Sequence, residues 1–234
     1  MSVPARWNSA IQAAAARTTL WRSLARPIDD AAPLATASVL IAAIVGAVSG
    51  LAGWLVAYVA PVHIAVVVTA ALWCALELAL PERSLASRVV GPERSSANVT
   101  QLVVTFAVLL RVAAVATVSV GVWVAALAMA TTVGRLQAVF LQFIADPVDD
   151  DGRTTADYRT QVIGLSELAL IAVTICVGGA FAFGWRIVLA VAVSLSVTFV
   201  IGLSQQRRRD SIAVELLGVV VWLGELITLF AIIR

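Results

Sequence analysis

The sequence predicts an all-α fold, a polytopic bundle of transmembrane helices. Of the 234 residues, 61% are hydrophobic and only 13% are charged, whereas a soluble domain has roughly half apolar and about a quarter charged residues. A large core cannot account for this excess, because a chain of this size buries only about 70% of its surface. Several uninterrupted apolar runs are long enough to cross a bilayer. These observations exclude a soluble enzyme and a secreted disulfide scaffold.

The apolar runs predict about seven spans. They cover residues 34–59, 62–80, 99–117, 118–134, 163–183, 187–204 and 211–233. The third and fourth spans hold a single charge, Arg111, and form either one long helix or two helices joined by a turn near Ser119 and Gly121. If these residues form two helices and the N-terminus is cytoplasmic, thirteen of the sixteen arginines lie on the cytoplasmic side and two outside, with Arg111 within a span. If they form one long helix, ten arginines lie on the cytoplasmic side, Arg111 included, and six lie outside. The positive-inside rule therefore favours seven spans in the cytoplasmic (inner) cell membrane.

Residues 1–32 are expected to form a cytoplasmic amphipathic arm, and residues 33–234 a single transmembrane helical domain. The arm alternates arginines with apolar residues at roughly helical spacing, which favours a helix lying on the membrane surface. It does not resemble a signal peptide, because the apolar run that follows it is too long. Residues 33–234 show no repeat and no low-complexity linker.

Charge and composition restrict the partners. A net charge of +2, with no stretch that interleaves basic and aromatic residues, excludes nucleic acid and leaves membrane lipid as the expected environment. Cys74 and Cys176 lie within apolar spans, where cysteines usually serve as small core residues. The lone His63 is expected at an external turn, without partners at metal-ligand spacing.

The densest acidic segment is the cytoplasmic loop 146–157, which contains Asp149, Asp150 and Asp151. An EF-hand reading fails, because counting back from Gly152 places Pro147 at the first ligand position. The loop is therefore expected to be solvated, with a weak Mg²⁺ site as the alternative.

Acidic residues inside apolar spans are more informative, because a charge within the bilayer is costly. Four occur, namely Glu77, Glu167, Glu215 and Glu225. In the last span Glu215, Gly218, Trp222 and Glu225 follow one another at spacings of 3, 4 and 3, which places them within an arc of about 80° on a helix. This polar stripe is predicted to face the bundle interior. The opposite face, formed by Leu216, Val220, Leu223 and Ile227, is predicted to contact acyl chains.

Glu225 is predicted to lie deep in the membrane, about 15 Å beyond Glu215 at 1.5 Å per residue. A carboxylate at that depth must be protonated or paired. Arg111 and Arg135 are the candidate partners. Such pairs either hold the bundle together or belong to a functional site, and the residues alone leave both readings open.

Two segments resemble the cobalamin synthase family, the adenosylcobinamide-GDP ribazoletransferases. They are WCALELALPERSLASRVVG at residues 73–91 and ELLGVVVWLGE at residues 215–225. The family carries G-x-H-x-D-G-L-A-D-x-x-D-G after a Trp-containing span and G-D-x-x-G-A-x-x-E-x-x-E in its last helix. The order of elements is similar along nearly the whole chain. A glycine-rich first span at 44–51, Arg111 where the family often has Lys, and Gly134-Arg135 in place of Ser-Arg are further points of similarity.

The first motif is degenerate in this chain. Leu85-Ala86 and Gly91 match it, whereas Pro81 replaces the His, and Arg83, Ser87 and Val90 replace the three Asp. The last-helix motif is better kept. Glu215 stands at its Asp, Gly218 and Glu225 match, and Trp222 replaces its first Glu.

The resemblance implies a Mg²⁺-dependent transfer of ribazole that releases GMP in assembly of the cobamide nucleotide loop. That chemistry needs Mg²⁺ held by several carboxylates, and the residues at the degenerate positions cannot supply them. Three interpretations stay open. In the first, the chain is a divergent ribazoletransferase that uses Glu215, Glu225 and the acids of 146–157. In the second, it is a non-catalytic paralogue that binds a corrinoid nucleotide, a lipid or a membrane protein partner. In the third, it is a small transporter component.

Overall fold

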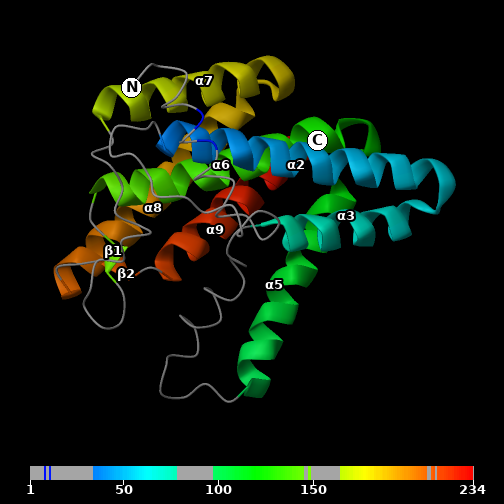
Figure 1. Ribbon diagram of the computed structural model, residues 1–234, viewed down its shortest axis with the longest axis horizontal. Helices are drawn as coiled ribbons and strands as arrows, with labels where there is room; N and C mark the ends of the chain where they lie inside the picture. Colours follow the sequence, from blue (N-terminus) through cyan, green and yellow to red (C-terminus); the bar gives the residue numbers. More distant parts are fainter. Residues whose placement is uncertain are drawn as a thin grey trace.

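A computed structural model describes residues 8, 11, 34–77, 97–144, 147–148, 164–209, 212–213 and 215–233 (Figure 1). Seven α-helices lie within these residues: α2 (Leu34–Val59), α3 (Val62–Leu76), α5 (Ala97–Thr117), α6 (Trp123–Ile144), α7 (Leu165–Phe183), α8 (Arg186–Arg209) and α9 (Glu215–Ile232). A 3₁₀ turn, η2 (Val120–Val122), precedes α6. Two short strands, β1 (Pro147–Val148) and β2 (Ile212–Ala213), pair in parallel. Of the predicted arm only Asn8 and Ile11 are described, and both are helical and exposed.

The seven helices lie where the seven apolar spans were predicted. Four of them (α2, α6 with η2, α7 and α8) are long and apolar enough to cross a membrane, whereas the apolar stretches of α3, α5 and α9 (Val62–Leu76, Gln101–Thr117 and Leu216–Ile232) are shorter. The molecule is therefore a helical bundle of membrane-protein character. The number of crossings and the cytoplasmic N-terminus stay predictions.

The break between the third and fourth spans is confirmed. α5 ends at Thr117, and the chain passes through η2 before α6 begins at Trp123. The predicted end of the fourth span at residue 134 is wrong, because α6 continues to Ile144 and buries Leu136 and Leu141 beyond that point. Arg135 consequently lies inside a helix.

α6 is the centre of the bundle, and α2 lies against it along much of its length (Figure 1). Two glycines of α2 make this approach possible. A Cβ atom at Gly46 would lie 2.3 Å from the Leu127 carbonyl oxygen, and one at Gly50 would lie 2.6 Å from the Trp123 carbonyl oxygen. Small residues that let helix backbones touch are a common packing device in membranes.

α9 packs against α6 in the same manner, and a Cβ at Gly224 would lie 3.1 Å from the Cα of Gly134. The prediction that the face of α9 opposite the polar stripe contacts lipid is wrong for Leu216 and Val220, which are only 4% and 1% exposed. Both belong to a buried cluster with residues of α6. An apolar face suits either lipid or a neighbouring helix, so composition could not distinguish the two.

The outer helices differ from this centre. α7 and α8 expose many of their apolar side chains, among them Leu170, Phe181 and Val193. α5 projects away from the other helices (Figure 1), and Leu102, Phe106 and Leu109 on it are exposed. α5 contacts the bundle mainly through α3 and α9.

Candidate functional site: a buried Glu–Arg–Glu cluster

Arg111 of α5 lies between two glutamates from different helices. Its Nη1 is 2.5 Å from Oε2 of Glu77, the residue that follows α3. Its Nη2 donates to Oε2 of Glu225 in the middle of α9. The side chains of Arg111 and Glu225 are 0% and 1% exposed, and Glu77 is also buried. The three side chains form what we term the charged cluster.

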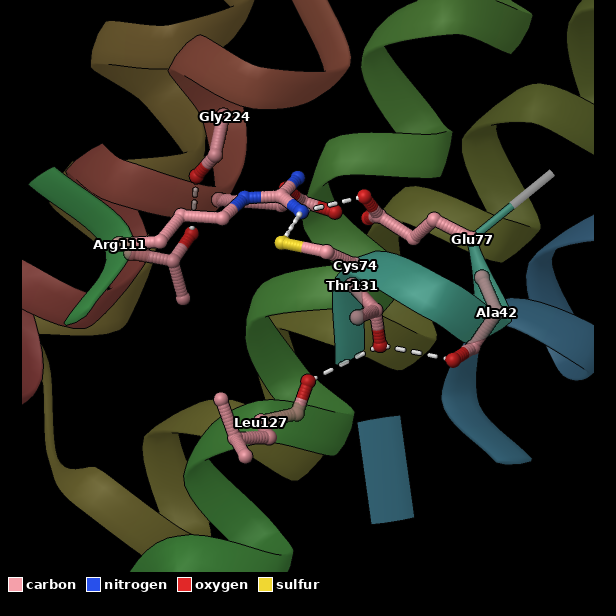
Figure 2. Close-up of polar contacts among 9 residues, drawn as sticks. Ala42, Cys74, Glu77, Arg111, Leu127, Thr131 and Gly224 are labelled. Carbon is pink, nitrogen blue, oxygen red and sulfur yellow. Dashed lines mark hydrogen bonds and ion pairs between the residues drawn. The ribbon is translucent and has the colours of Figure 1, made fainter. Parts of the chain in front are cut away.

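Two further residues of α3 surround the guanidinium. Its central carbon lies 4.4 Å from the centre of the Trp73 ring, a distance at which a cation is attracted to an aromatic face. The Sγ atom of Cys74 lies 3.6 Å from Nη1 of Arg111. Figure 2 shows Cys74 and Glu77 directed toward the guanidinium from the same helix end.

The local backbone places both carboxylates. α3 ends at Leu76, and the backbone of the next residue, Glu77, is extended (φ −67°, ψ 142°) while its amide still donates to the Trp73 carbonyl oxygen. On α9, Glu225 has room only because residue 134 of α6 is glycine, since a Cβ there would lie 2.7 Å from Cγ of Glu225.

Burial makes this pairing necessary. A guanidinium or carboxylate taken out of water without a partner costs several kcal/mol, and one partner of opposite charge offsets only part of that cost. Arg111 is the single charged residue in the sequence of α5, and its charge is met by two carboxylates.

A small cavity of about 20 Å³ adjoins the charged cluster, which is space for one water molecule. Glu77, Glu225, Thr131 and the half-buried Arg135 line it, together with the apolar residues Ala42, Val45, Leu76 and Val221. The Thr131 hydroxyl lies within hydrogen-bonding distance of the carbonyl oxygens of Ala42 and Leu127 (Figure 2).

The predicted pairing of Glu225 with an arginine is therefore present, and Arg111 forms such a pair. Arg135 lines the same cavity as Glu225. Gly218 and Trp222 are buried, as expected of a stripe that faces the interior. Glu215 begins α9, and its side chain lies outside the described part of the structure.

Sequence reasoning did not assign Glu77 to this site. The available signal was its place among the four acids inside the predicted apolar spans. Glu167, another of the four, lies elsewhere. It is half-buried in the first turn of α7, where its Oε1 accepts a hydrogen bond of 2.6 Å from the Thr36 hydroxyl of α2.

A second buried polar group was not predicted either. Nε2 of Gln137 in α6 donates to Oγ of Ser194 in α8 at 2.9 Å, and Oγ1 of Thr198 donates to Oε1 of Gln137 at 2.9 Å. All three side chains are buried. We term them the neutral cluster. The four-residue spacing of Ser194 and Thr198, which places them on one helix face, was the signal in the sequence.

The residues that the structure describes do not suit Mg²⁺ as they stand. They contain no group of three or more His, Cys, Asp or Glu side chains placed to hold a metal ion, and Glu77 and Glu225 are engaged by Arg111. The weak metal candidates Asp149, Asp150 and Asp151 lie outside the described residues, as do the degenerate motif positions Pro81, Arg83, Ser87 and Val90.

No family model matches the sequence, and no curated protein or solved structure matches it either. The resemblance to the cobalamin synthases therefore stays a prediction, carried mainly by the two segments at residues 73–91 and 215–225. The charged cluster joins these two segments, since Glu77 belongs to the first and Glu225 to the second.

Proposed function

We propose that this protein is a multi-pass protein of the cytoplasmic membrane that binds a corrinoid nucleotide without transferring ribazole to it. The observation that carries the proposal is the pairing of Glu225 with Arg111. Glu225 is the acid that the last helix shares with the family motif, and in this chain it neutralises an arginine and is not open to a metal ion.

Retained packing beside lost chemistry supports this proposal. Gly218, the glycine that the last helix shares with the family motif, is buried in the bundle. The metal-binding motif of the first segment holds Pro81, Arg83, Ser87 and Val90 instead of His and Asp. Magnesium-assisted chemistry at a phosphodiester needs carboxylates that can hold the ion, whereas binding of the same ligand does not.

The test is reconstitution of the protein in liposomes with adenosylcobinamide-GDP, α-ribazole and Mg²⁺. We expect saturable retention of the coloured corrinoid with no release of GMP above protein-free liposomes. An ordinary family member assayed in parallel provides the positive control for transfer. GMP release at a comparable rate would overturn the non-catalytic assignment, and absence of corrinoid retention would overturn the assignment of the ligand.

The divergent-enzyme alternative has one structural observation in its favour. β1 pairs in parallel with β2, with Val148 opposite Ala213. In the sequence, Asp149–Asp151 directly follow β1, and Glu215 lies two residues beyond β2. Under this alternative these acids hold Mg²⁺, so GMP release would be seen and the triple change Asp149→Asn, Asp150→Asn and Asp151→Asn would abolish it.

The transporter alternative is favoured by the cavity beside two buried carboxylates, because carboxylates inside membranes commonly form ion relays. Liposomes that enclose a pH-sensitive dye would then show proton flux that Glu225→Gln removes. Under the binding proposal we expect no flux above that of empty liposomes.

A further inference from the structure

The cavity beside the charged cluster has both hydrogen-bond acceptors and hydrogen-bond donors in its wall. Glu77 and Glu225 line it with carboxylate oxygens, Arg135 with a guanidinium and Thr131 with a hydroxyl. Arg111 pairs with both glutamates beside the cavity. The charged side chains that the structure describes at this position are therefore two acids and two bases, and their formal charges sum to zero.

A site without net charge favours an uncharged ligand. A cation would meet two guanidinium groups and an anion would meet two carboxylates, so neither gains the excess of opposite charge that offsets the loss of its hydration. An uncharged group that donates and accepts hydrogen bonds costs much less to remove from water, provided that both kinds of bond form again in the site. The mixed wall of this cavity supplies partners for both.

A primary carboxamide matches this wall. Its NH₂ group carries two donors, and its carbonyl oxygen is an acceptor. The carboxylates of Glu77 and Glu225 supply acceptors, and the guanidinium of Arg135 supplies donors. A carboxylate that is bonded to an arginine still accepts further hydrogen bonds, because its two oxygens together offer about four lone-pair sites.

The size and the apolar part of the lining indicate how a carboxamide would enter. The cavity of about 20 Å³ is partly open and has space for about one water molecule. The NH₂ group, with its single heavy atom, fits that space, and the carbonyl group then lies at the mouth. The apolar part of the lining, which would contact the methylene groups that carry the amide, consists of Ala42, Val45, Leu76 and Val221.

We propose that this cavity binds a side-chain carboxamide of the corrinoid. Its NH₂ group donates to the carboxylates of Glu77 and Glu225, and its carbonyl oxygen accepts from Arg135. This assignment rests on the proposed function, since the corrin ring of adenosylcobinamide-GDP carries several side chains that end in primary carboxamides. It adds that the protein distinguishes a carboxamide from a carboxylate at one of these side chains.

The test measures retention of adenosylcobinamide-GDP by the full chain in liposomes, beside analogues in each of which one carboxamide is hydrolysed to a carboxylate. We expect one analogue to bind at least about tenfold more weakly than the amide ligand, because its anion faces two glutamates and like charges brought together at a binding site are strongly unfavourable. Glu77→Gln (E77Q) removes one of these negative charges. It should bind the same analogue more tightly than the wild type does and remove most of the difference.

Val45→Leu tests the space and leaves every charge in place. Its larger side chain occupies the cavity, so binding of adenosylcobinamide-GDP should weaken by at least about tenfold through loss of the hydrogen bonds, and the preference for the amide should disappear. The matched control is Val48→Leu, the same substitution at an exposed position of α2, which should leave the affinity for both ligands unchanged. Gel filtration establishes that each variant is monodisperse.

Two results would overturn the assignment of the carboxamide while leaving the corrinoid as the ligand. All analogues could bind as tightly as adenosylcobinamide-GDP, or one weak analogue could keep its full deficit in E77Q and Val45→Leu, which would place the recognised amide elsewhere. If E77Q is not monodisperse, Val45→Leu alone decides, and an unchanged deficit in that variant overturns the assignment. Absence of retention by the wild type would overturn the proposed function and this assignment together.

Discussion

The bundle contains two buried polar clusters that are stabilised in different ways. The charged cluster joins α3, α5 and α9 through Glu77, Arg111 and Glu225, and the neutral cluster joins α6 and α8 through Gln137, Ser194 and Thr198. In the neutral cluster each side chain keeps a neutral hydrogen-bonding partner. In the charged cluster the three side chains must both find hydrogen-bonding partners and balance their charges.

The two clusters are expected to differ in the free energy of unfolding that is lost when one of their members is removed. Removal of one member of a buried ion pair leaves a charge without compensation, which costs about 3–5 kcal/mol. An interhelical hydrogen bond in a membrane protein contributes about 0.6 kcal/mol on average and at most about 1.7 kcal/mol. The charged cluster is therefore expected to set the position of α5, whereas the neutral cluster adds a smaller increment to the α6–α8 contact.

The largest effect is expected for Arg111→Met. The change leaves Glu77 and Glu225 buried without their common partner, so the free energy of unfolding should fall by about 3–5 kcal/mol. Denaturant unfolding in micelles, followed by tryptophan fluorescence, measures this loss. The neutral triple variant R111M/E77Q/E225Q should recover most of it, and a loss for R111M alone as small as that of the neutral cluster would contradict the comparison.

Gly134→Ala tests how closely the charged cluster is packed. The added Cβ would lie 2.7 Å from Cγ of Glu225 and 2.8 Å from the Val221 carbonyl oxygen, so overpacking should cost about 1–3 kcal/mol. The control is Gly178→Ala on α7, where a Cβ meets no atom within 4 Å. That change should instead stabilise the helix by about 0.5–1 kcal/mol, and equal effects at the two positions would argue against a tight contact at Gly134.

Gln137→Leu breaks the neutral cluster at its central residue. It removes the hydrogen bonds to both Ser194 and Thr198. We expect the free energy of unfolding to fall by about 1–2 kcal/mol, because each such bond contributes about 0.6 kcal/mol on average and at most about 1.7 kcal/mol. Ser196→Ala on the exposed face of α8, whose hydroxyl bonds only within its own helix, is the matched control. A loss for Gln137→Leu that exceeds that of R111M would reverse the ranking of the two clusters.

The smallest effect is expected for Thr36→Val, which removes the hydrogen bond to Glu167 at the ends of α2 and α7. Both side chains are half-buried, so water can replace part of the bond, and we expect a loss of about 0.5–1 kcal/mol. A double-mutant cycle with Glu167→Gln measures the coupling directly. The control Thr174→Val, at an exposed hydroxyl that bonds within α7, should leave the free energy of unfolding nearly unchanged. Absence of coupling between Thr36 and Glu167 in the cycle would mean that their contact does not stabilise the protein.

The sequence by itself determined the helical class and the approximate helices, because apolar runs of membrane length leave the backbone little choice except to satisfy its hydrogen bonds internally. The break between α5 and α6 was also accessible, from the asymmetry of the arginines and from Ser119 and Gly121. The inward direction of Glu225 followed from helical spacing and from the cost of a charge in lipid.

Only the tertiary structure decided that Arg111 pairs with both Glu225 and Glu77, and that α9 is buried at Leu216 and Val220 as well as along its polar stripe. These facts depend on which helices are neighbours, and apolar residues such as those of α9 carry no signal that distinguishes a helix neighbour from lipid. The extent of α6 beyond residue 134 has the same cause. Arg135 suggests the end of a span when the sequence is considered alone, whereas in the structure it lies within α6 and lines the cavity beside Glu77 and Glu225.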